Sequence, residues 1–273
     1  MNSKTRDLLK NWLPPIMLRG LRAFTSGIRW SGNYTSWTEA QQASNGYDSE
    51  NILGAVREAL LKIKKGDAVY ERDSVLFDEM QYSWPLLAAL MWIAAASKGV
   101  LNLVDFGGSL GSTYFQNRKF LFCLPKVRWN IVEQPHFVDC GKTNFEDDIL
   151  SFYYDIDTCI RQVSSNTILL SGVIQYLEKP YYFLEEITNL GFEYIIFDRT
   201  AFNKAEGDRL TIQKVPEEIY KASYPAWFLN KRRFLDILLS RYEIIASWQD
   251  NTDAANIPSI FEGYIFKIKT YPM

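Results

Sequence analysis

Beyond residue 100, short apolar runs alternate with segments of helical spacing. Strands are predicted at Val100–Phe106, Trp129–Val132, Leu150–Tyr154, Thr167–Leu170 and Tyr194–Phe197. Among the segments between them, Thr113–Leu124 and Tyr181–Leu190 are predicted helices, and Gly191 follows the second one as a helix-terminating glycine should. Strands that alternate with helices are joined by crossover connections. The pattern therefore predicts a parallel sheet that is covered on both faces.

The last part of the chain departs from this alternation. A predicted helix, Lys231–Ser240, precedes two β-rich segments, Tyr242–Trp248 and Gly263–Ile268, which are separated only by the polar turn Gln249–Ala255. Two strands joined without a helix must lie antiparallel. The sequence thus predicts an α/β sheet of seven strands in which the last strand is antiparallel.

The first hundred residues have a different pattern. The segment 51–64 carries apolar residues at 52, 53, 56, 60 and 63, which is helical spacing. A second helix, Trp84–Ser97, is apolar nearly all round and is therefore expected to be buried. We expect a helical N-terminal extension or lid over residues 1–98, followed by the main domain over 99–273.

Composition limits the class of protein. The 273 residues are 47% hydrophobic with a net charge of −2, which is typical of a globular protein and argues against a nucleic-acid binder. Three cysteines without a CxxC spacing favour a reducing, cytoplasmic setting. The longest apolar stretch, Leu86–Ala96, is too short to span a bilayer. No spacing of His, Asp or Glu requires a metal, so we expect none.

Positive charge is concentrated at the N-terminus. Residues 1–30 hold six Lys or Arg against one Asp, and residues 16, 17, 18, 21 and 24 are apolar. This segment could form a short interfacial helix on anionic lipid, which would make the protein peripheral to the inner membrane. An arm packed on the domain is the alternative.

The most informative stretch is Leu103-Val-Asp-Phe-Gly-Gly-Ser-Leu-Gly-Ser, between a predicted strand and a predicted helix. Its glycines, Gly107, Gly108 and Gly111, allow a ligand to approach the backbone closely, and the helix N-terminus favours an anion. Glu133 follows 26 residues after Gly107 at the end of the next strand, where an acid can accept both hydroxyls of a ribose. Together these features predict a nucleoside cofactor.

The glycine spacing narrows the choice of cofactor. The loop is not GxGxxG, and it has no Walker lysine, so an NTP-hydrolysing loop is excluded. Its D-x-G-G-x-x-G form, starting at Asp105, resembles the first motif of class I S-adenosylmethionine (SAM) methyltransferases. The antiparallel seventh strand is the other hallmark of that Rossmann-like fold.

The resemblance extends over nearly the whole chain. It is carried by Tyr70-Glu-Arg-Asp-Ser-Val-Leu-Phe-Asp-Glu, Gln81-Tyr-Ser-Trp-Pro-Leu-Leu, Asp105-Phe-Gly-Gly-Ser-Leu-Gly-Ser, Val132-Glu-Gln-Pro and Ser223-Tyr-Pro-Ala-Trp-Phe. These motifs are similar to those of a family of bacterial methyltransferases that are often encoded among surface-polysaccharide and O-antigen genes. The resemblance implies the class I methyltransferase fold, SAM as cofactor, and methyl transfer as the reaction.

Carried over to this sequence, the family pattern implies a cofactor site. Asp105 and the backbone of the three loop glycines would hold the methionine part of SAM, and Glu133 the ribose hydroxyls with Gln134 beside it. Asp155 matches a position that contacts the adenine amine, although a helix N-cap is an equal alternative. The full cofactor set is Asp105, Gly107, Gly108, Ser109, Gly111, Glu133, Gln134, Asp155 and Ser171.

Catalytic candidates follow the fourth and fifth strands. In Ser171-Gly-Val-Ile-Gln-Tyr-Leu such enzymes place residues between cofactor and acceptor, which makes Gln175 and Tyr176 candidates, with core packing as the alternative for Tyr176. Asp198 and Arg199 could serve as general base and acceptor-anchoring cation, or form a local ion pair. His136, the one histidine, is the weaker choice of base.

Acceptor binding is expected from two further segments. Glu71 and Arg72 could form part of a lid over the pocket, or a solvated charge cluster. Tyr224 and Trp227 lie between the fifth strand and the last helix, where aromatic faces would suit stacking on sugar rings, or core packing.

The sequence therefore predicts a SAM-dependent methyltransferase that acts on an oxygen of a saccharide or lipid-linked glycan precursor of the bacterial surface, with a small-molecule, glycan or glycolipid acceptor as its partner. Two alternatives stay open. An NAD-dependent oxidoreductase or epimerase would need GxGxxG and usually Tyr-x-x-x-Lys, which the sequence lacks. A non-catalytic, glycan- or partner-binding subunit would have no need of the loop and Glu133.

Overall fold

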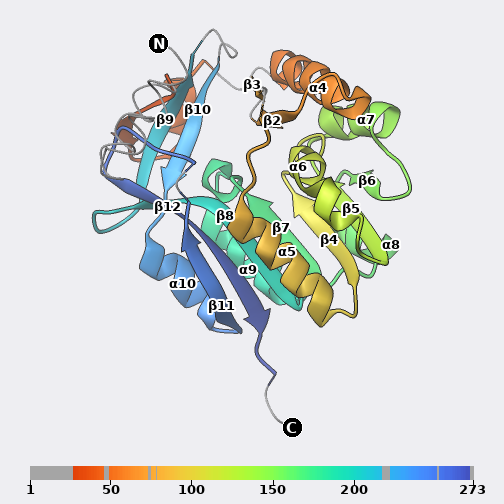
Figure 1. Ribbon diagram of the computed structural model, residues 1–273. Coiled ribbons are helices and arrows are strands. Elements are labelled where there is room, and N and C mark those ends of the chain that lie inside the picture. The colour runs from red at the N-terminus through yellow and green to blue at the C-terminus, as the bar shows by residue number, and fades with distance from the viewer. Residues whose placement is uncertain are drawn as a thin grey trace, which may run out of the picture.

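The computed structural model describes residues 27–45, 49–72, 75–77, 79–216, 222–250 and 252–270. A seven-stranded sheet forms the centre of this part, and a smaller three-stranded sheet stands beside it (Figure 1). The central sheet has the order β11-β12-β8-β7-β4-β5-β6. Its strands are β4 (Val100–Phe106), β5 (Lys126–Val132), β6 (Leu150–Tyr153), β7 (Thr167–Ser171), β8 (Tyr194–Asn203), β11 (Tyr242–Gln249) and β12 (Ser259–Ile268).

The strand directions confirm the expected fold class. β4, β5, β6, β7 and β8 pair in parallel, whereas β12 pairs antiparallel with both β8 and β11. The last strand of the chain is therefore inserted, reversed, between β8 and β11. This is the Rossmann-like arrangement that the sequence predicts, with seven strands and the last one antiparallel.

Helices cover both faces of the central sheet. One face is covered by α5 (Trp84–Ala96), α6 (Ser112–Leu121) and α7 (Pro135–Asn144), with α4 (Ser49–Lys65) packed on α6 and α7, and the other face is covered by α8 (Ile156–Gln162), α9 (Pro180–Leu190) and α10 (Lys231–Leu239). Neighbouring residues of a strand divide between the two cores, as Leu103 and Val104 do. Gly191 ends α9 in the left-handed conformation, with a φ of +73°, as its position predicts.

The smaller sheet consists of strands that the sequence analysis does not predict. Its order is β1 (Arg29–Tyr34), β9 (Arg209–Val215) and β10 (Ala222–Phe228), and α3 (Trp37–Gln42) contacts all three strands. A two-stranded hairpin, β2 (Tyr70–Arg72) and β3 (Val75–Phe77), lies between α4 and α5. The expected helical region thus also contributes strands. The division of the chain at residue 98 stays a prediction.

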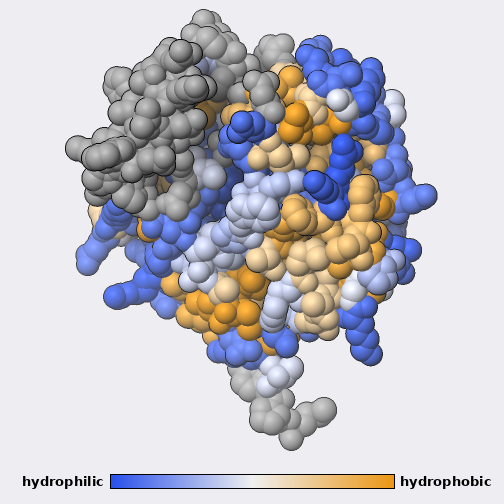
Figure 2. All heavy atoms as spheres, viewed as in Figure 1, coloured by the Kyte–Doolittle hydropathy of each residue, from blue (hydrophilic) through white to orange (hydrophobic). Residues whose placement is uncertain are grey.

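The expectation that the helix Trp84–Ser97 is buried holds for only one of its sides. One side of α5 packs on β4 and β8, but Trp84 is 60% exposed and Trp92 is 40% exposed. Figure 2 shows apolar residues gathered over α5 and over the edge strand β11. Apolar composition alone could not distinguish an enclosed helix from one that is open on one side.

Candidate functional site

Three polar residues lie in a row where the parallel pairing of neighbouring strands stops. Asp105, Ser171 and Asp198 each follow by two positions a residue of the same core cluster, namely Leu103, Leu169 and Ile196. Side chains two apart share a face of a strand, and β4, β7 and β8 are adjacent. The three polar groups therefore lie at the carboxyl edge on the α5 side, where ligands of open α/β sheets bind.

The glycine loop turns tightly between β4 and α6. Gly107 and Gly111 have φ values of +69° and +100°, and Ser109 adopts +54° without being glycine. The Gly107 N–H donates to the Val132 carbonyl at 2.9 Å, and the Gly111 N–H donates to the Gly108 carbonyl at 3.0 Å. These two N–H groups are therefore already bonded to backbone carbonyls of the protein. Gly107, Gly108 and Ser109 line the cavity, whereas Gly111 serves as the N-cap of α6 and is not a lining residue.

Asp105 lies directly beneath this loop. A Cβ atom on Gly108 would be 2.5 Å from Cγ and Oδ2 of Asp105, so only glycine fits above the carboxyl group. The Trp129 indole donates to Oδ2 at 2.8 Å. The pKa of Asp105 is raised to about 7, because burial and, to a smaller extent, the nearby Glu133 carboxylate raise it more than the Trp129 hydrogen bond lowers it. Asp105 thus shapes the loop and places beneath it a carboxyl group that keeps its proton up to about pH 7.

Replacing Asp105 with asparagine is expected to stabilise the protein in a pH-dependent way. The native carboxyl keeps its proton up to about pH 7, while the unfolded one loses it near pH 4, so the stability of the unsubstituted protein falls across this interval. Asp105→Asn removes that effect. We expect no gain near pH 4 and a gain in unfolding free energy on the order of 1–3 kcal/mol above pH 7, measured by urea denaturation. A gain of equal size at both pH values would contradict this account.

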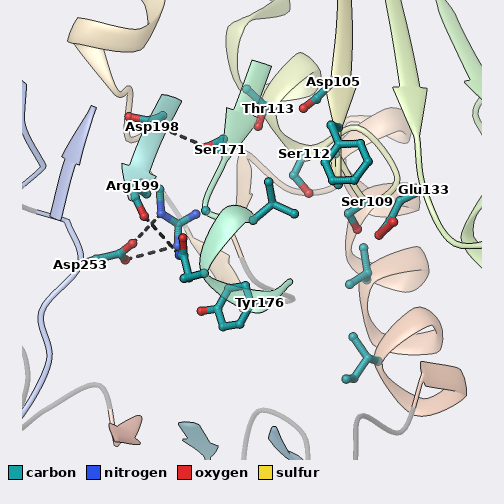
Figure 3. Close-up of a pocket in the computed structure, with 18 of the residues that line it drawn as sticks. Asp105, Ser109, Ser112, Thr113, Glu133, Ser171, Tyr176, Asp198, Arg199 and Asp253 are labelled. Carbon is teal, nitrogen blue, oxygen red and sulfur yellow. Dashed lines mark hydrogen bonds and ion pairs between the residues drawn. The ribbon is translucent and has the colours of Figure 1, made fainter. Parts of the chain in front are cut away.

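Glu133 stands across the loop from Asp105, directly after β5. Burial raises its pKa, and the backbone N–H of Gln134 donates to Oε2 at 2.8 Å, which lowers it. Within the described residues, that N–H is the one hydrogen-bond donor to this carboxylate. In Figure 3 Glu133 and Ser109 lie together on one side of the cavity. Gln134 lines the cavity and is the N-cap of α7. The oxygens of this desolvated carboxylate can accept further hydrogen bonds, which suits a ligand with hydroxyl groups.

The position expected to contact adenine is occupied differently. Asp155 is exposed, does not line the cavity, and accepts hydrogen bonds from the Thr158 N–H at 2.7 Å and the Thr158 hydroxyl at 3.0 Å. These bonds lower its pKa, the backbone bond most. Asp155 is therefore the N-cap of α8, and its contact with adenine stays a prediction. The residue beside it, Tyr154, lines the cavity instead, with its hydroxyl donating to Asp139 at 2.7 Å.

Replacing Asp155 with alanine is accordingly expected to act on stability and not on ligand binding. Loss of an N-cap typically costs about 1 kcal/mol of unfolding free energy. Thermal denaturation should show a lower Tm, whereas calorimetric affinity for a nucleoside ligand should stay within about twofold of the unsubstituted protein. A large loss of affinity in a folded Asp155→Ala variant would return this residue to the binding site.

Asp198 and Arg199 occupy the opposite side of the cavity. Asp198 is 2% exposed and accepts hydrogen bonds from the Ser171 hydroxyl at 3.1 Å and the Trp248 indole at 3.2 Å. Burial raises its pKa to about 6. Arg199 pairs with Asp253, whose Oδ2 lies 2.7 Å from Nε, as Figure 3 shows. The local ion pair therefore joins Arg199 to Asp253, a residue the sequence analysis did not single out.

Gln175 and Tyr176 lie between these two sides. Gln175 is 4% exposed, its Nε2 donates to the Arg199 carbonyl at 3.2 Å, and its Oε1 has no hydrogen-bond partner within the described part of the chain. The Tyr176 hydroxyl donates to Gln213 at 2.8 Å, and Gln213 donates to the Tyr224 hydroxyl at 3.2 Å. Both tyrosines and both glutamines line the cavity. Tyr176 is thus a wall residue rather than core.

The other residues predicted to bind the acceptor differ in their relation to the cavity. Glu71 lines the cavity, is 3% exposed and accepts a hydrogen bond from the Ser112 hydroxyl at 2.6 Å, so it is not a solvated surface charge. Arg72 belongs to β2, and its side chain lies outside the described residues. Trp227 does not line the cavity but stacks on Trp37, a lining residue, with ring centroids 6.4 Å apart. Trp227 thus lies behind the aromatic ring that faces the cavity, and a role for it in acceptor binding stays a prediction.

One continuous cavity of about 810 Å³ joins the lining groups, from the glycine loop and Glu133 to Asp198, Arg199 and residues of β9 and β10. A cavity of this volume can hold two small molecules, or one small molecule and part of another. Among the described residues, no cluster of His, Cys, Asp or Glu is arranged to hold a metal ion. In the same part of the chain, every helix is too short or too polar to cross a bilayer.

Comparison with known proteins gives weak likenesses. No family model matches the chain, and no curated protein matches it. Among solved structures, the N-terminal domain of EvdMO1 with SAH and D-fucose is 11% identical, covering 78% of this chain and 97% of its own, with a TM-score of 0.48. The 1,6-didemethyltoxoflavin-N1-methyltransferase of Burkholderia thailandensis is 11% identical, covering 82% and 92%, with a TM-score of 0.43. At these values the assignment of the fold rests on the chain's own strand order.

Proposed function

We propose that this protein is a SAM-dependent methyltransferase that methylates an oxygen of a saccharide or of a lipid-linked glycan precursor of the bacterial surface. The observation that supports this most is the single cavity. It connects a nucleoside-type loop and acid on one side with a buried carboxyl group and aromatic walls on the other.

The residues around the loop fit SAM. Gly107 and Gly108 leave no room for a side chain, since a Cβ on Gly107 would lie 2.4 Å from Val173 Cγ2 and one on Gly108 2.5 Å from the Asp105 carboxyl. Glu133 offers carboxylate oxygens for the ribose hydroxyls. The Glu133 carboxylate, joined above about pH 7 by that of Asp105, also places negative charge beside a ligand that carries a sulfonium and an ammonium group.

The opposite side fits an uncharged hydroxyl-bearing acceptor. Trp30, Trp37, Tyr176 and Tyr224 give it aromatic faces of the kind on which sugar rings stack. Gln175 Oε1 and the Asp198 carboxylate are hydrogen-bond acceptors that a sugar hydroxyl can satisfy. Phosphate and carboxylate acceptors would meet Arg199 only in competition with Asp253.

These residues have separable roles in methyl transfer. When bound, SAM supplies an activated methyl group, and its transfer breaks the C–S bond and leaves the neutral thioether S-adenosylhomocysteine (SAH). The aromatic walls and Gln175 orient the acceptor hydroxyl. This positioning supplies most of the rate enhancement. Asp198 accepts the hydroxyl proton as the oxygen forms its bond to carbon.

Methyl transfer from isotopically labelled SAM to a panel of saccharides and glycolipids tests the proposal. Mass spectrometry should find one added methyl group on an oxygen of an acceptor, and permethylation mapping should locate it. Transfer to nitrogen alone would reject the oxygen specificity. Binding of NAD without binding of SAM or SAH would reject the reaction class.

We further propose that residues 1–30 bring the enzyme to an anionic membrane, where a lipid-linked acceptor would be found. Most of this segment, residues 1–26, lies outside the described residues, and the proposal rests on its positive charge and apolar positions. Co-sedimentation with vesicles that contain anionic lipid should decrease when residues 1–26 are deleted. Equal binding with and without the segment would end this part of the proposal.

A further inference from the structure

The strand that carries Asp198 is interrupted at that residue. Pairing of β8 with β12 shifts between Glu262 and Tyr264, so that Asp198 and Arg199 together oppose the single residue Gly263. Arg199 has a φ of +55°, which is unusual for a residue other than glycine. Such a bulge bends the strand and redirects the side chains beside it. The position of Asp198 at the cavity is therefore a built feature of the sheet.

A tryptophan from the neighbouring strand occupies the space beside this bulge. Trp248 of β11 pairs directly with Gly263, and a Cβ on Gly263 would lie 2.2 Å from Cε2 of the indole. The indole therefore packs flat against bare backbone. Its Nε1–H donates to Oδ1 of Asp198 at 3.2 Å, while the Ser171 hydroxyl donates to Oδ2 at 3.1 Å. Both carboxyl oxygens are thus held, from two sides.

The charges around Asp198 explain why this support matters. Burial and the Asp250 carboxylate, from the turn after β11, raise the pKa of Asp198. Arg199 on its own strand, the Ser171 hydroxyl and the Trp248 indole lower it. A general base acts only when ionised, so groups that donate to the carboxylate keep it available near neutral pH.

We propose that Trp248, seated on Gly263, is a positioning residue that orients Asp198 toward the acceptor and keeps its carboxyl group ionised. The proposal rests on the proposed function, because it assigns to Asp198 the task of accepting the acceptor's proton. Trp248 acts through Asp198. It is not one of the residues that line the cavity.

Titration of the carboxyl group tests this without any acceptor. In ¹³C NMR of the protein labelled at aspartate, the signal of Asp198 is identified by its loss in Asp198→Asn. Trp248→Phe keeps a ring on Gly263 but removes the N–H donor, and we expect the pKa of Asp198 to rise by about 0.5–1 unit. Gly263→Ala keeps the indole but displaces it, and should shift the pKa in the same direction.

A control and a kinetic readout complete the test. Trp92→Phe changes an indole that is 40% exposed on α5 and should leave the titration of Asp198 unchanged. The acid limb of the pH–rate profile should move to higher pH in Trp248→Phe, with kcat restored to within about threefold at high pH. An unshifted Asp198 signal in both Trp248→Phe and Gly263→Ala would overturn the positioning role. A shifted signal combined with full methyl transfer by Asp198→Asn would instead overturn the base role in the proposed function.

Discussion

Asp198→Asn is expected to lower kcat for methyl transfer by about 10²–10⁴-fold, the range typical for loss of a general base. The Oδ1 of the substituted amide can still accept the hydrogen bond from the Trp248 indole, and its NH2 group can donate to the Ser171 hydroxyl oxygen, so the fold should persist. It cannot take up the proton of the acceptor hydroxyl. Single-turnover transfer from labelled SAM measures the loss, and affinity for SAH should change by no more than about twofold because Asp198 lies across the cavity from Glu133.

Asp236→Asn is the matched control for this prediction. Asp236 is an exposed aspartate on α10, on the far side of the sheet from the cavity, and its substitution should leave kcat unchanged. If Asp198→Asn retains kcat while binding SAH normally, the alkoxide would have to form without this base. The assignment of Asp198 would then be wrong, although the cofactor site would stand.

Gly108→Ala is expected to reduce affinity for SAH by at least about tenfold, because the added methyl group cannot fit. Its Cβ would lie 2.5 Å from the Asp105 carboxyl group, which is buried and held by Trp129, so the loop and not the aspartate must move. Displacing the loop alters the surface on which the cofactor would rest. Isothermal titration calorimetry measures the change.

Gly54→Ala separates this effect from the general effect of removing a glycine. Gly54 lies inside α4, and a Cβ there meets nothing within 4 Å. The helix should gain about 0.5–1 kcal/mol in unfolding free energy, with unchanged affinity for SAH. Normal SAH affinity in a folded Gly108→Ala variant would show that the loop does not form the cofactor surface.

The central sheet could be predicted from the sequence because its signals are local. Each buried strand is a short apolar run, and helix-terminating residues such as Gly191 after α9 mark where helices end. The small sheet could not be predicted in this way. β1 alternates poorly, with Trp30 its one buried residue, and it pairs with β9 about 180 residues away. Its stability comes from packing that no local pattern encodes.

The candidate site was predictable to the same extent. Glu133, Ser171 and Asp198 follow recognisable strands, so position along the chain predicts their position at the sheet edge. Asp253 and Trp248 come from the β11–β12 hairpin, and only the folded sheet brings them to Arg199 and Asp198.

Local chemistry also left real ambiguities. An aspartate before a helix is equally a ligand contact or an N-cap, and Asp155 proves to be the cap because both its oxygens are bonded to Thr158. An aromatic residue between strands is equally wall or core. Tyr176 and Tyr224 line the cavity, whereas Trp227 lies behind Trp37. Side-chain direction, which decides these cases, depends on the tertiary structure.

A crystal structure of the protein with SAH tests the central claim most directly. The account predicts that SAH lies in the cavity between the glycine loop and Tyr154, with its ribose hydroxyls on the Glu133 carboxylate and its sulfur facing Gln175 and Asp198. SAH bound elsewhere, or a crystal at saturating SAH in which a side chain fills the space beside Gly108 and Glu133, would contradict it.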